Sequence, residues 1–154
     1  MTVIKAITVR QPWASCIAHL GPSGKRVENR GRPTSHRGPV AIHAGKTADL
    51  LADTDPRVTH LFGRDPRVGM PVGAVIAVAQ LVDCHQAAGR CCAPWGEAHY
   101  MTGGKMLPAF HLVLADVRRL DRPVPARGAL SVPWTLPGDV ADLVAAQLAE
   151  AAAR

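Results

Sequence analysis

The sequence predicts a single α+β domain built around a small β-barrel with flanking helices. Segments typical of strands outnumber those typical of helices, and the two kinds do not alternate regularly, which argues against a doubly wound parallel sheet. The chain has 154 residues, 47% hydrophobic and 19% charged, a size and composition typical of one globular domain. Because aromatic residues make up only 4%, we expect a core of Val, Ile, Leu and Ala.

The first elements are predicted to be a strand and a short helix. Residues 3–10 alternate apolar and polar side chains, which is typical of a strand. Pro12 suits the first position of a helix, and Gly21 with Pro22 ends that helix. Four side chains at helical spacing predict one buried stripe: Trp13, Cys16, Ile17 and Leu20.

The middle of the chain is predicted to supply most of the sheet. Residues 24–31 form a turn into a short strand, and residues 38–45 form a second strand bounded by glycines. Residues 47–63 have weak helical character, interrupted by an Asp-Pro pair at 55–56. The run at 73–83 is the most apolar, so we expect this strand at the centre of the sheet.

The last third should contain a loop, a strand and a helix. Residues 84–105 have the composition of a loop, residues 109–117 alternate as a strand, and residues 118–128 resemble an edge segment punctuated by prolines. Asp139 is placed to cap a final amphipathic helix. The apolar face of that helix is predicted from its spacing: Val140, Leu143, Val144, Leu148 and Ala151.

We therefore expect one domain over residues 1–135, with residues 136–154 forming a C-terminal helix packed on it. No apolar run approaches the ~20 residues that a membrane-spanning helix needs. The N-terminus alternates like a strand and lacks the apolar core of a signal peptide. These features predict a cytoplasmic protein whose cysteines are thiols. The oligomeric state cannot be read from the sequence.

Positive charge is concentrated in the N-terminal half. The net charge is +6, and residues 1–67 hold eleven Lys and Arg against five Asp and Glu. Six basic residues within 22–47 face only one acid, Glu28: Lys25, Arg26, Arg30, Arg32, Arg37 and Lys46. Such a concentration is typical of a protein with a polyanionic partner, such as RNA or DNA. The alternative is a solvated basic loop without a partner.

Three motifs within residues 7–46 resemble the signature of the activating-signal-cointegrator homology (ASCH) family. They are I-T-V-R-Q-P-W-A-S, G-K-R-V-E-N-R and R-G-P-V-A-I-H-A-G-K, in that order. The resemblance extends over roughly residues 3–135 and implies a PUA-like fold, a small pseudo-barrel with a cleft beside the first helix. Relatives with this fold bind RNA, DNA or modified bases. Some are amidohydrolases of N4-acetylcytidine, others are linked to RNA cleavage, and eukaryotic members act as coactivator domains.

Lys25, Glu28 and Arg30 are the central candidates for a site. An ammonium beside a carboxylate can polarise a carbonyl or phosphate while the acid moves a proton. In the amidohydrolases the corresponding turn supplies a Thr nucleophile, whereas this chain has Glu28 at that position. Because glutamate has no hydroxyl, this chain lacks at that position the group expected to attack an amide. The alternative for all three is a surface ion pair, which contributes little to stability.

The end of the first strand offers further ligand-binding candidates: Arg10, Gln11 and Trp13. The planar guanidinium of Arg10 suits phosphate. Trp13 is either a stacking platform for a base or part of the core, because it lies in line with the apolar stripe. His43 points opposite to its apolar neighbours, into the cleft or to the outer surface. Arg26, Arg37 and Lys46 complete the basic set.

The cysteine- and histidine-containing segment is not predicted to bind metal. Cys84, His85, Cys91, Cys92 and His99 contain no Cys-x-x-Cys pair, and adjacent cysteines rarely ligate one tetrahedral ion. We expect no metal and no cofactor.

These observations favour an ASCH-type domain that binds nucleic acid (RNA or DNA) or a nucleotide-like small molecule in a basic cleft, with affinity that falls steeply with salt. One alternative is a metal-independent hydrolase, acting on a modified nucleoside such as N4-acetylcytidine or on RNA, with Lys25 and Glu28 as the catalytic pair. The other is a protein-interaction domain. We expect no membrane partner.

Overall fold

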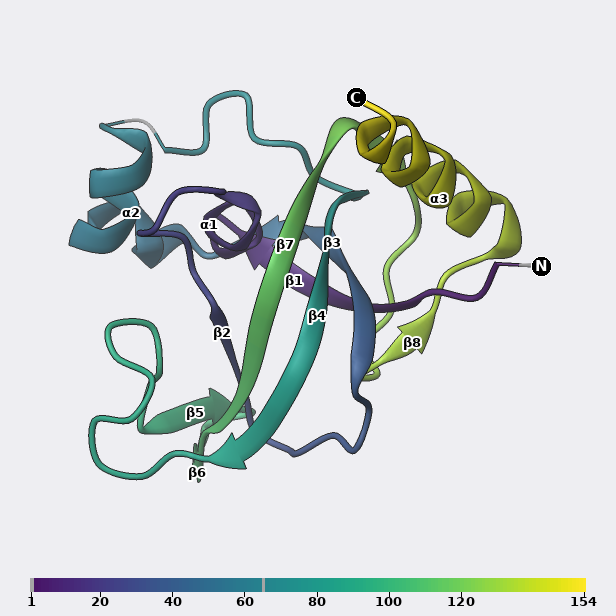
Figure 1. Cartoon of the computed structure of the whole chain (residues 1–154). Coiled ribbons are helices and arrows are strands. Elements are labelled where there is room, and N and C mark those ends of the chain that lie inside the picture. The colour runs from purple at the N-terminus through teal and green to yellow at the C-terminus, as the bar shows by residue number, and fades with distance from the viewer. Residues whose placement is uncertain (1, 65) are drawn as a thin grey trace.

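The computed structural model describes residues 2–64 and 66–154, and its main feature is a six-stranded sheet with helices on both faces (Figure 1). The order across the sheet is β2-β7-β4-β3-β1-β8, in which β1 runs parallel to β3 and the other neighbours are antiparallel. The strands are β1 (Lys5–Gln11), β2 (Val27–Arg30), β3 (Gly38–Ala48), β4 (Ala74–Gln86), β7 (Phe110–Pro125) and β8 (Trp134–Thr135).

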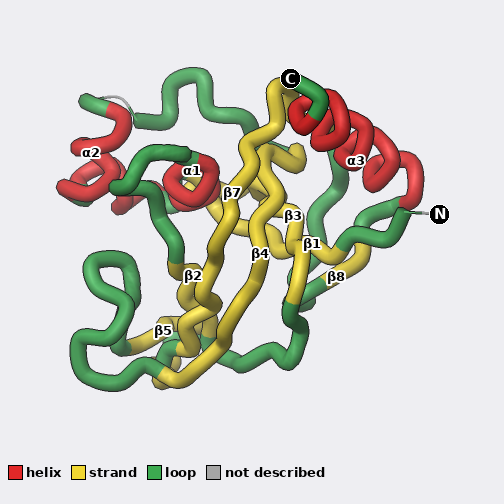
Figure 2. Tube along the Cα trace, viewed as in Figure 1, coloured by secondary structure: helices red, strands yellow, loops and turns green. Residues whose placement is uncertain are grey.

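A two-stranded hairpin and four helices complete the described part of the chain (Figure 2). The hairpin pairs β5 with β6. These elements are α1 (Trp13–Ala18), the 3-10 helix η1 (Leu50–Thr54), α2 (Pro56–Phe62), β5 (His99–Thr102), β6 (Lys105–Pro108) and α3 (Gly138–Ala152). The predicted α+β class is confirmed. The predicted barrel is not closed, because β2 and β8 are the two edges of the sheet over the described residues.

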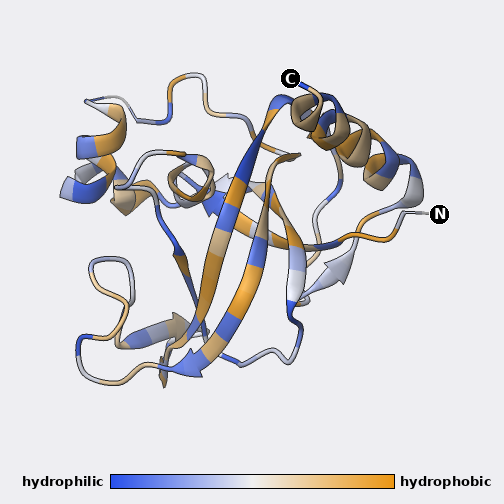
Figure 3. Cartoon of the chain, viewed as in Figure 1, coloured by the Kyte–Doolittle hydropathy of each residue, from blue (hydrophilic) through white to orange (hydrophobic). Residues whose placement is uncertain are grey.

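Two hydrophobic clusters fill the two faces of the sheet. Alternate residues of β1 divide between them: Ile7 packs with α1 residues such as Ile17, whereas Ala6 packs with α3 residues such as Val144. The strand at 74–86 is likewise buried on both faces over most of its length, which explains its nearly continuous apolar run (Figure 3). The expectation that this strand is central is confirmed.

Four local expectations are wrong. Helix α1 ends at Ala18, so Leu20 lies outside it and is 57% exposed. Leu143 of α3 is 58% exposed, and Asp139 lies in the first turn of that helix without capping it. The segment at 118–128 is not separate: β7 continues through a bulge at Asp116, which has a φ of 48°.

The C-terminal helix docks on β7 through a side chain that imitates a strand partner. Gln147 accepts a hydrogen bond from the backbone N–H of Arg122 (3.0 Å) and donates one to its carbonyl (2.8 Å). Gln147 is buried although it is polar. None of the described helices is long and apolar enough to cross a membrane.

Candidate ligand-binding cleft

A cleft of about 300 Å³ opens beside α1, between the ends of β1 and β2 and the loop that precedes β5. Its lining combines charged and aromatic side chains from segments far apart in the sequence. They include Arg10, Trp13, Lys25, Glu28, Arg30 and Asp49 from the N-terminal third, and Arg57, Trp95, Glu97 and Tyr100 from further along. The cleft therefore brings together two of the three ASCH-like motifs, the one that contains Arg10 and Trp13 and the one that contains Lys25 and Glu28.

Lys25, Glu28 and Arg30 form one ion-pair network in the cleft wall. Lys25 Nζ donates to Glu28 Oε1 (2.8 Å) and to the carbonyl of Val27 (2.5 Å). Arg30 contacts Glu28 Oε2 through Nε (3.2 Å) and Nη2 (3.0 Å), and Nη2 also donates to the carbonyl of Thr8 (2.6 Å). Lys25 is 3% and Glu28 8% exposed. The network is therefore buried, unlike the weak surface pair that was the alternative.

The position of Lys25 depends on the turn before β2. The backbone N–H of Lys25 donates to the carbonyl of Cys16 (2.8 Å), which ties this residue to α1. Because Lys25 lies outside β2, it is free of the strand alternation that would turn it away from Glu28. Gly24 is required here, because a Cβ at that position would overlap the carbonyl oxygen of His19.

Opposing effects set the ionisation of Glu28. Burial disfavours the charged carboxylate, but the adjacent Lys25 and Arg30 outweigh it, so the pKa of Glu28 is held below its ordinary 4.5. Glu28 is therefore ionised at neutral pH. Its carboxylate accepts from both cations, so it holds Lys25 and Arg30 in place at the edge of the cleft.

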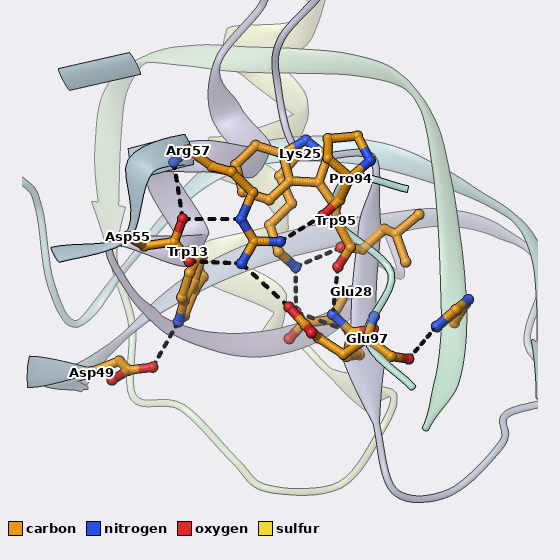
Figure 4. A network of polar contacts seen from close by, with 12 residues as sticks. Trp13, Lys25, Glu28, Asp49, Asp55, Arg57, Pro94, Trp95 and Glu97 are labelled. Atoms are coloured by element: carbon orange, nitrogen blue, oxygen red, sulfur yellow. Dashed lines mark hydrogen bonds and ion pairs between the residues drawn. The ribbon is translucent and has the colours of Figure 1, made fainter. Parts of the chain in front are cut away.

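An aromatic corner, formed by Trp13 and Trp95, also lines the cleft (Figure 4). Trp13 and Trp95 meet edge to face, with ring centroids 6.4 Å apart and an interplanar angle of 83°. The Arg57 guanidinium lies 4.9 Å from the Trp95 ring centroid and 5.6 Å from that of Trp13. The indole N–H of Trp13 donates to Asp49 (2.9 Å). Trp13 thus has two roles. It packs against the hydrophobic cluster that contains Ile17 of α1, and it also lines the cleft.

Arg57 and Asn29 hold the loop that carries Trp95. Arg57 binds Asp55 through two hydrogen bonds (3.0 and 2.7 Å), which lower the pKa of that carboxyl, and it also donates to the carbonyl of Pro94 (2.6 Å) and to Glu97 (3.2 Å). Asn29 donates to the carbonyl of Trp95 (3.0 Å) and accepts from the N–H of Glu97 (2.8 Å). The loop is therefore fastened to both β2 and α2.

The cleft is only weakly positive. Its lining contains four cations (Arg10, Lys25, Arg30 and Arg57) and three carboxylates (Glu28, Asp49 and Glu97), which gives 4 − 3 = +1. Arg10 is the one of these cations whose side chain is exposed. The walls thus suit a planar ligand of modest charge better than a long polyanion.

Several of the predicted ligand-binding residues have structural roles outside the cleft. Gln11 is buried and joins the carbonyl of Pro71 (2.8 Å) to the N–H of Ser15 (2.9 Å). Arg26 donates to carbonyls at the end of α1, including those of Ile17 (2.9 Å) and His19 (2.7 Å).

Arg37 is likewise away from the cleft. It donates to nearby backbone carbonyls and lies 4.0 Å from Asp83.

His43 and Lys46 line a separate hollow with Gly73 and Arg127. His43 is buried, with its Nε2 2.7 Å from the carbonyl of Ala126 and its Nδ1 3.3 Å from the Thr8 hydroxyl. The three predicted stretches therefore do not line one hollow. His43 faces away from the cleft because alternate residues of β3 point to opposite sides.

Some lining residues could not be picked out from the sequence. Arg57, Glu97 and Tyr100 lie outside the three motifs. Asn29 lies within G-K-R-V-E-N-R, but nothing in that motif marks it as a lining residue. Trp95 had one signal: aromatic residues are scarce, so each Trp invites an explanation.

The segment rich in Cys and His contains a second cluster. The structure gathers His85, Cys91 and Cys92 with His111 of β7. Cys84 and His99, which the sequence grouping included, are not part of it, and His111, which it omitted, is. These four side chains are the group among the described residues whose donor atoms could hold a metal ion.

The fold matches that of two solved structures. One is the crystal structure of ASCH from Zymomonas mobilis, 16% identical, with a TM-score of 0.53 over 92% of this chain and 93% of that chain. The other is a mutant of the Zymomonas mobilis protein, 18% identical, with a TM-score of 0.54 over 92% and 96%. No protein-family model and no curated protein matches the sequence. The ASCH resemblance noted in the sequence is thus supported by the fold.

Proposed function

We propose that this chain, which has the fold of the ASCH proteins, binds a single nucleobase in the cleft beside α1, presented by RNA, DNA or a free nucleotide. The observation that carries the proposal is that one cleft is lined both by a buried network of Lys25, Glu28 and Arg30 and by an aromatic corner of Trp13 and Trp95. Trp95 is only 6% exposed, so stacking on a base would fall to the less buried Trp13. Fixed donors would read the polar edge of the base.

The proposed roles follow from the contacts. Lys25 uses two of its three N–H donors on Val27 and Glu28, within the described residues, which leaves one for a base carbonyl. Glu28 is a positioning residue for the two cations. Arg10, exposed at the cleft, is placed to meet a phosphate. A volume of about 300 Å³ suits one nucleoside.

The test is calorimetric titration with the nucleosides, the nucleoside 5′-monophosphates, and short single-stranded RNA and DNA. Lys25→Met should weaken binding at least about tenfold, the loss of one hydrogen bond to a charged group. Lys46→Met removes a lysine outside the cleft and is the matched control. Circular dichroism checks that both variants fold. Absence of binding to every compound, or equal losses in both variants, would contradict the proposal.

A second candidate is hydrolysis of a modified nucleoside, favoured by the buried Lys25–Glu28 pair. Lys25 would polarise the acyl carbonyl of N4-acetylcytidine while water attacks it, giving acetate and cytidine. Water must be the nucleophile, because Glu28 replaces the Thr of the amidohydrolases and the Thr8 hydroxyl is engaged by Trp134 (3.1 Å) and His43. Chromatography would detect cytidine release. Equal rates with and without Lys25→Met would contradict this role.

A further inference from the structure

Four potential metal ligands meet where the central strands join the loop that carries Trp95. His85 lies near the end of β4 and His111 near the start of β7. Cys91 and Cys92 lie in the loop that leads from β4 to β5. Their donor atoms all lie within 4.8 Å of one another. His111 is 1% exposed, and the other three are partly buried.

Three sulfur–nitrogen separations among these atoms are close to the edge of a coordination tetrahedron. Cys91 Sγ lies 3.7 Å from His85 Nε2 and 3.5 Å from His111 Nδ1, and Cys92 Sγ lies 3.4 Å from His85 Nε2. Zinc binds Cys sulfur at about 2.3 Å and His nitrogen at about 2.0 Å. Tetrahedral geometry then separates a sulfur from a nitrogen by about 3.5 Å.

The hydrogen bonds behind the two imidazoles direct their lone pairs at the sulfurs. His85 Nδ1 lies 2.7 Å from Asp83 Oδ2, and His111 Nε2 lies 2.7 Å from the carbonyl of Glu97. Carboxylate and carbonyl oxygens accept hydrogen bonds, so these two nitrogens are the ones that carry hydrogen. The opposite nitrogens, Nε2 of His85 and Nδ1 of His111, are then available as ligands. Metal-binding histidines are oriented in this way by an outer acceptor.

The backbone conformation is unusual where the two cysteines adjoin. Cys92 has a φ of 61°, a left-handed conformation that is uncommon outside glycine. This geometry accompanies the convergence of both thiols on His85, which the sequence pattern alone argued against. The N–H of Ala88 donates to Cys91 Sγ (3.4 Å), a bond that favours a thiolate.

We propose that His85, Cys91, Cys92 and His111 bind one Zn²⁺ in a closed tetrahedral Cys2His2 site. Two thiolates and two imidazoles are a ligand set that zinc prefers, and four protein ligands are typical of a structural rather than a catalytic zinc ion.

The role of the ion is to fix one wall of the cleft. It joins β4 and β7 to the loop, and the loop continues at once into Trp95 and Glu97. The N–H of Gly96 donates to the carbonyl of Cys92 (2.8 Å), and the His111 imidazole contacts the carbonyl of Glu97. Two of the ligands, Cys92 and His111, are therefore hydrogen-bonded to the backbone next to Trp95.

The experiment is metal analysis of the full chain by plasma mass spectrometry, after purification and after reconstitution with Zn²⁺. We expect about one zinc per chain, and cobalt substitution should give the intense visible bands of tetrahedral thiolate coordination. Cys92→Ser and His85→Gln should each reduce the retained zinc at least about tenfold. Cys84→Ser and His99→Gln, matched changes outside the cluster, should retain it.

Three results would overturn the proposal. They are a wild-type chain that retains no zinc after reconstitution, equal losses in Cys84→Ser and Cys92→Ser, and a Cys91–Cys92 disulfide detected by mass in freshly prepared protein. Metal content is independent of nucleobase binding, so either proposal can fail while the other stands. Removal of the ion should also increase amide hydrogen exchange over residues 87–98 more than over β4, which tests its role in holding the loop.

Discussion

Glu28 is the residue on which the cleft depends most. It is buried between Lys25 and Arg30, and both cations would lack their anionic partner without it. Removing one member of a buried ion pair is far more destabilising than removing a surface charge, because the remaining charge has already lost its water. Replacing Glu28 should therefore lower the stability of the fold as well as disturb the cleft.

Glu28→Ala should destabilise the chain by about 3–5 kcal/mol, the usual result of leaving a buried charge unpaired. The measurement is urea unfolding followed by circular dichroism. An effect below about 1 kcal/mol, as for an exposed pair, would contradict the buried network.

The lowered pKa of Glu28 also predicts a pH dependence. A carboxyl with a lower pKa in the folded state than in the unfolded state stabilises the fold above the unfolded value. That contribution should be present above pH 4.5 and should be lost as pH falls through the lower folded value. Glu28→Gln should therefore show a shallower acid loss of unfolding free energy than the wild type. Parallel curves for the two proteins would contradict this assignment.

The sequence anticipates which side chains lie together where a motif describes a local turn. Lys25, Glu28 and Arg30 lie within six residues, so their meeting depends on one short turn and one short strand. His43 also lies in one of the motifs, but it lines the second hollow and not the cleft. The alternation of β3 left two sides open to it, and only the tertiary packing chose between them.

At the scale of elements, the docking of α3 on the sheet depends on a polar side chain as well as on its apolar face. Gln147 satisfies both backbone groups of Arg122 on β7, while Val140 and Val144 fill the core below. Glu150, on the same helix, contacts the exposed guanidinium of that same Arg122 at 3.6 Å. The two contacts allow a matched comparison of buried and exposed interactions.

Gln147→Ala should cost about 1–3 kcal/mol, because it leaves a backbone donor and a backbone acceptor without their partner. Glu150→Ala removes only a surface ion pair and should change the unfolding free energy by less than about 1 kcal/mol. Urea unfolding of both variants provides the comparison. If the two variants were equally stable, Gln147 would not anchor the helix.

The elements with the clearest periodicity were the easiest to predict. The central strand, the strand before it and the C-terminal helix all follow from local spacing. The continuation of β7 through Asp116 could not be anticipated, because prolines at 123 and 125 are typical of an edge and no residue pattern announces the bulge. Those prolines are tolerated because β2 pairs only with the first part of β7.

At the scale of the whole molecule, the positive charge of the N-terminal half is dispersed. Arg26 is bound to backbone carbonyls, Arg37 lies near Asp83, and Lys46 belongs to the second hollow. The basic residues that looked like one polyanion-binding surface in the sequence therefore do not converge. Only the fold could reveal this, because clustering in sequence does not imply clustering in space.

This dispersal changes the salt dependence that we expect. With few phosphate contacts, affinity for a nucleotide or short single strand should fall less than about tenfold between about 50 mM and about 200 mM salt. A surface that neutralises many phosphates would instead lose about a thousandfold or more over the same range. Calorimetric titration at the two salt concentrations distinguishes them. The steeper loss would restore the extended basic surface predicted from the sequence.

Thr8 lies between the two hollows and contributes to both. Its backbone carbonyl accepts from Arg30 on the cleft side, while its hydroxyl accepts from Trp134 and contacts His43 on the other. A single ¹³C-labelled methyl group at this position would consequently sense occupancy on either side of β1. One resonance can thus report, in solution, on ligand binding in either hollow.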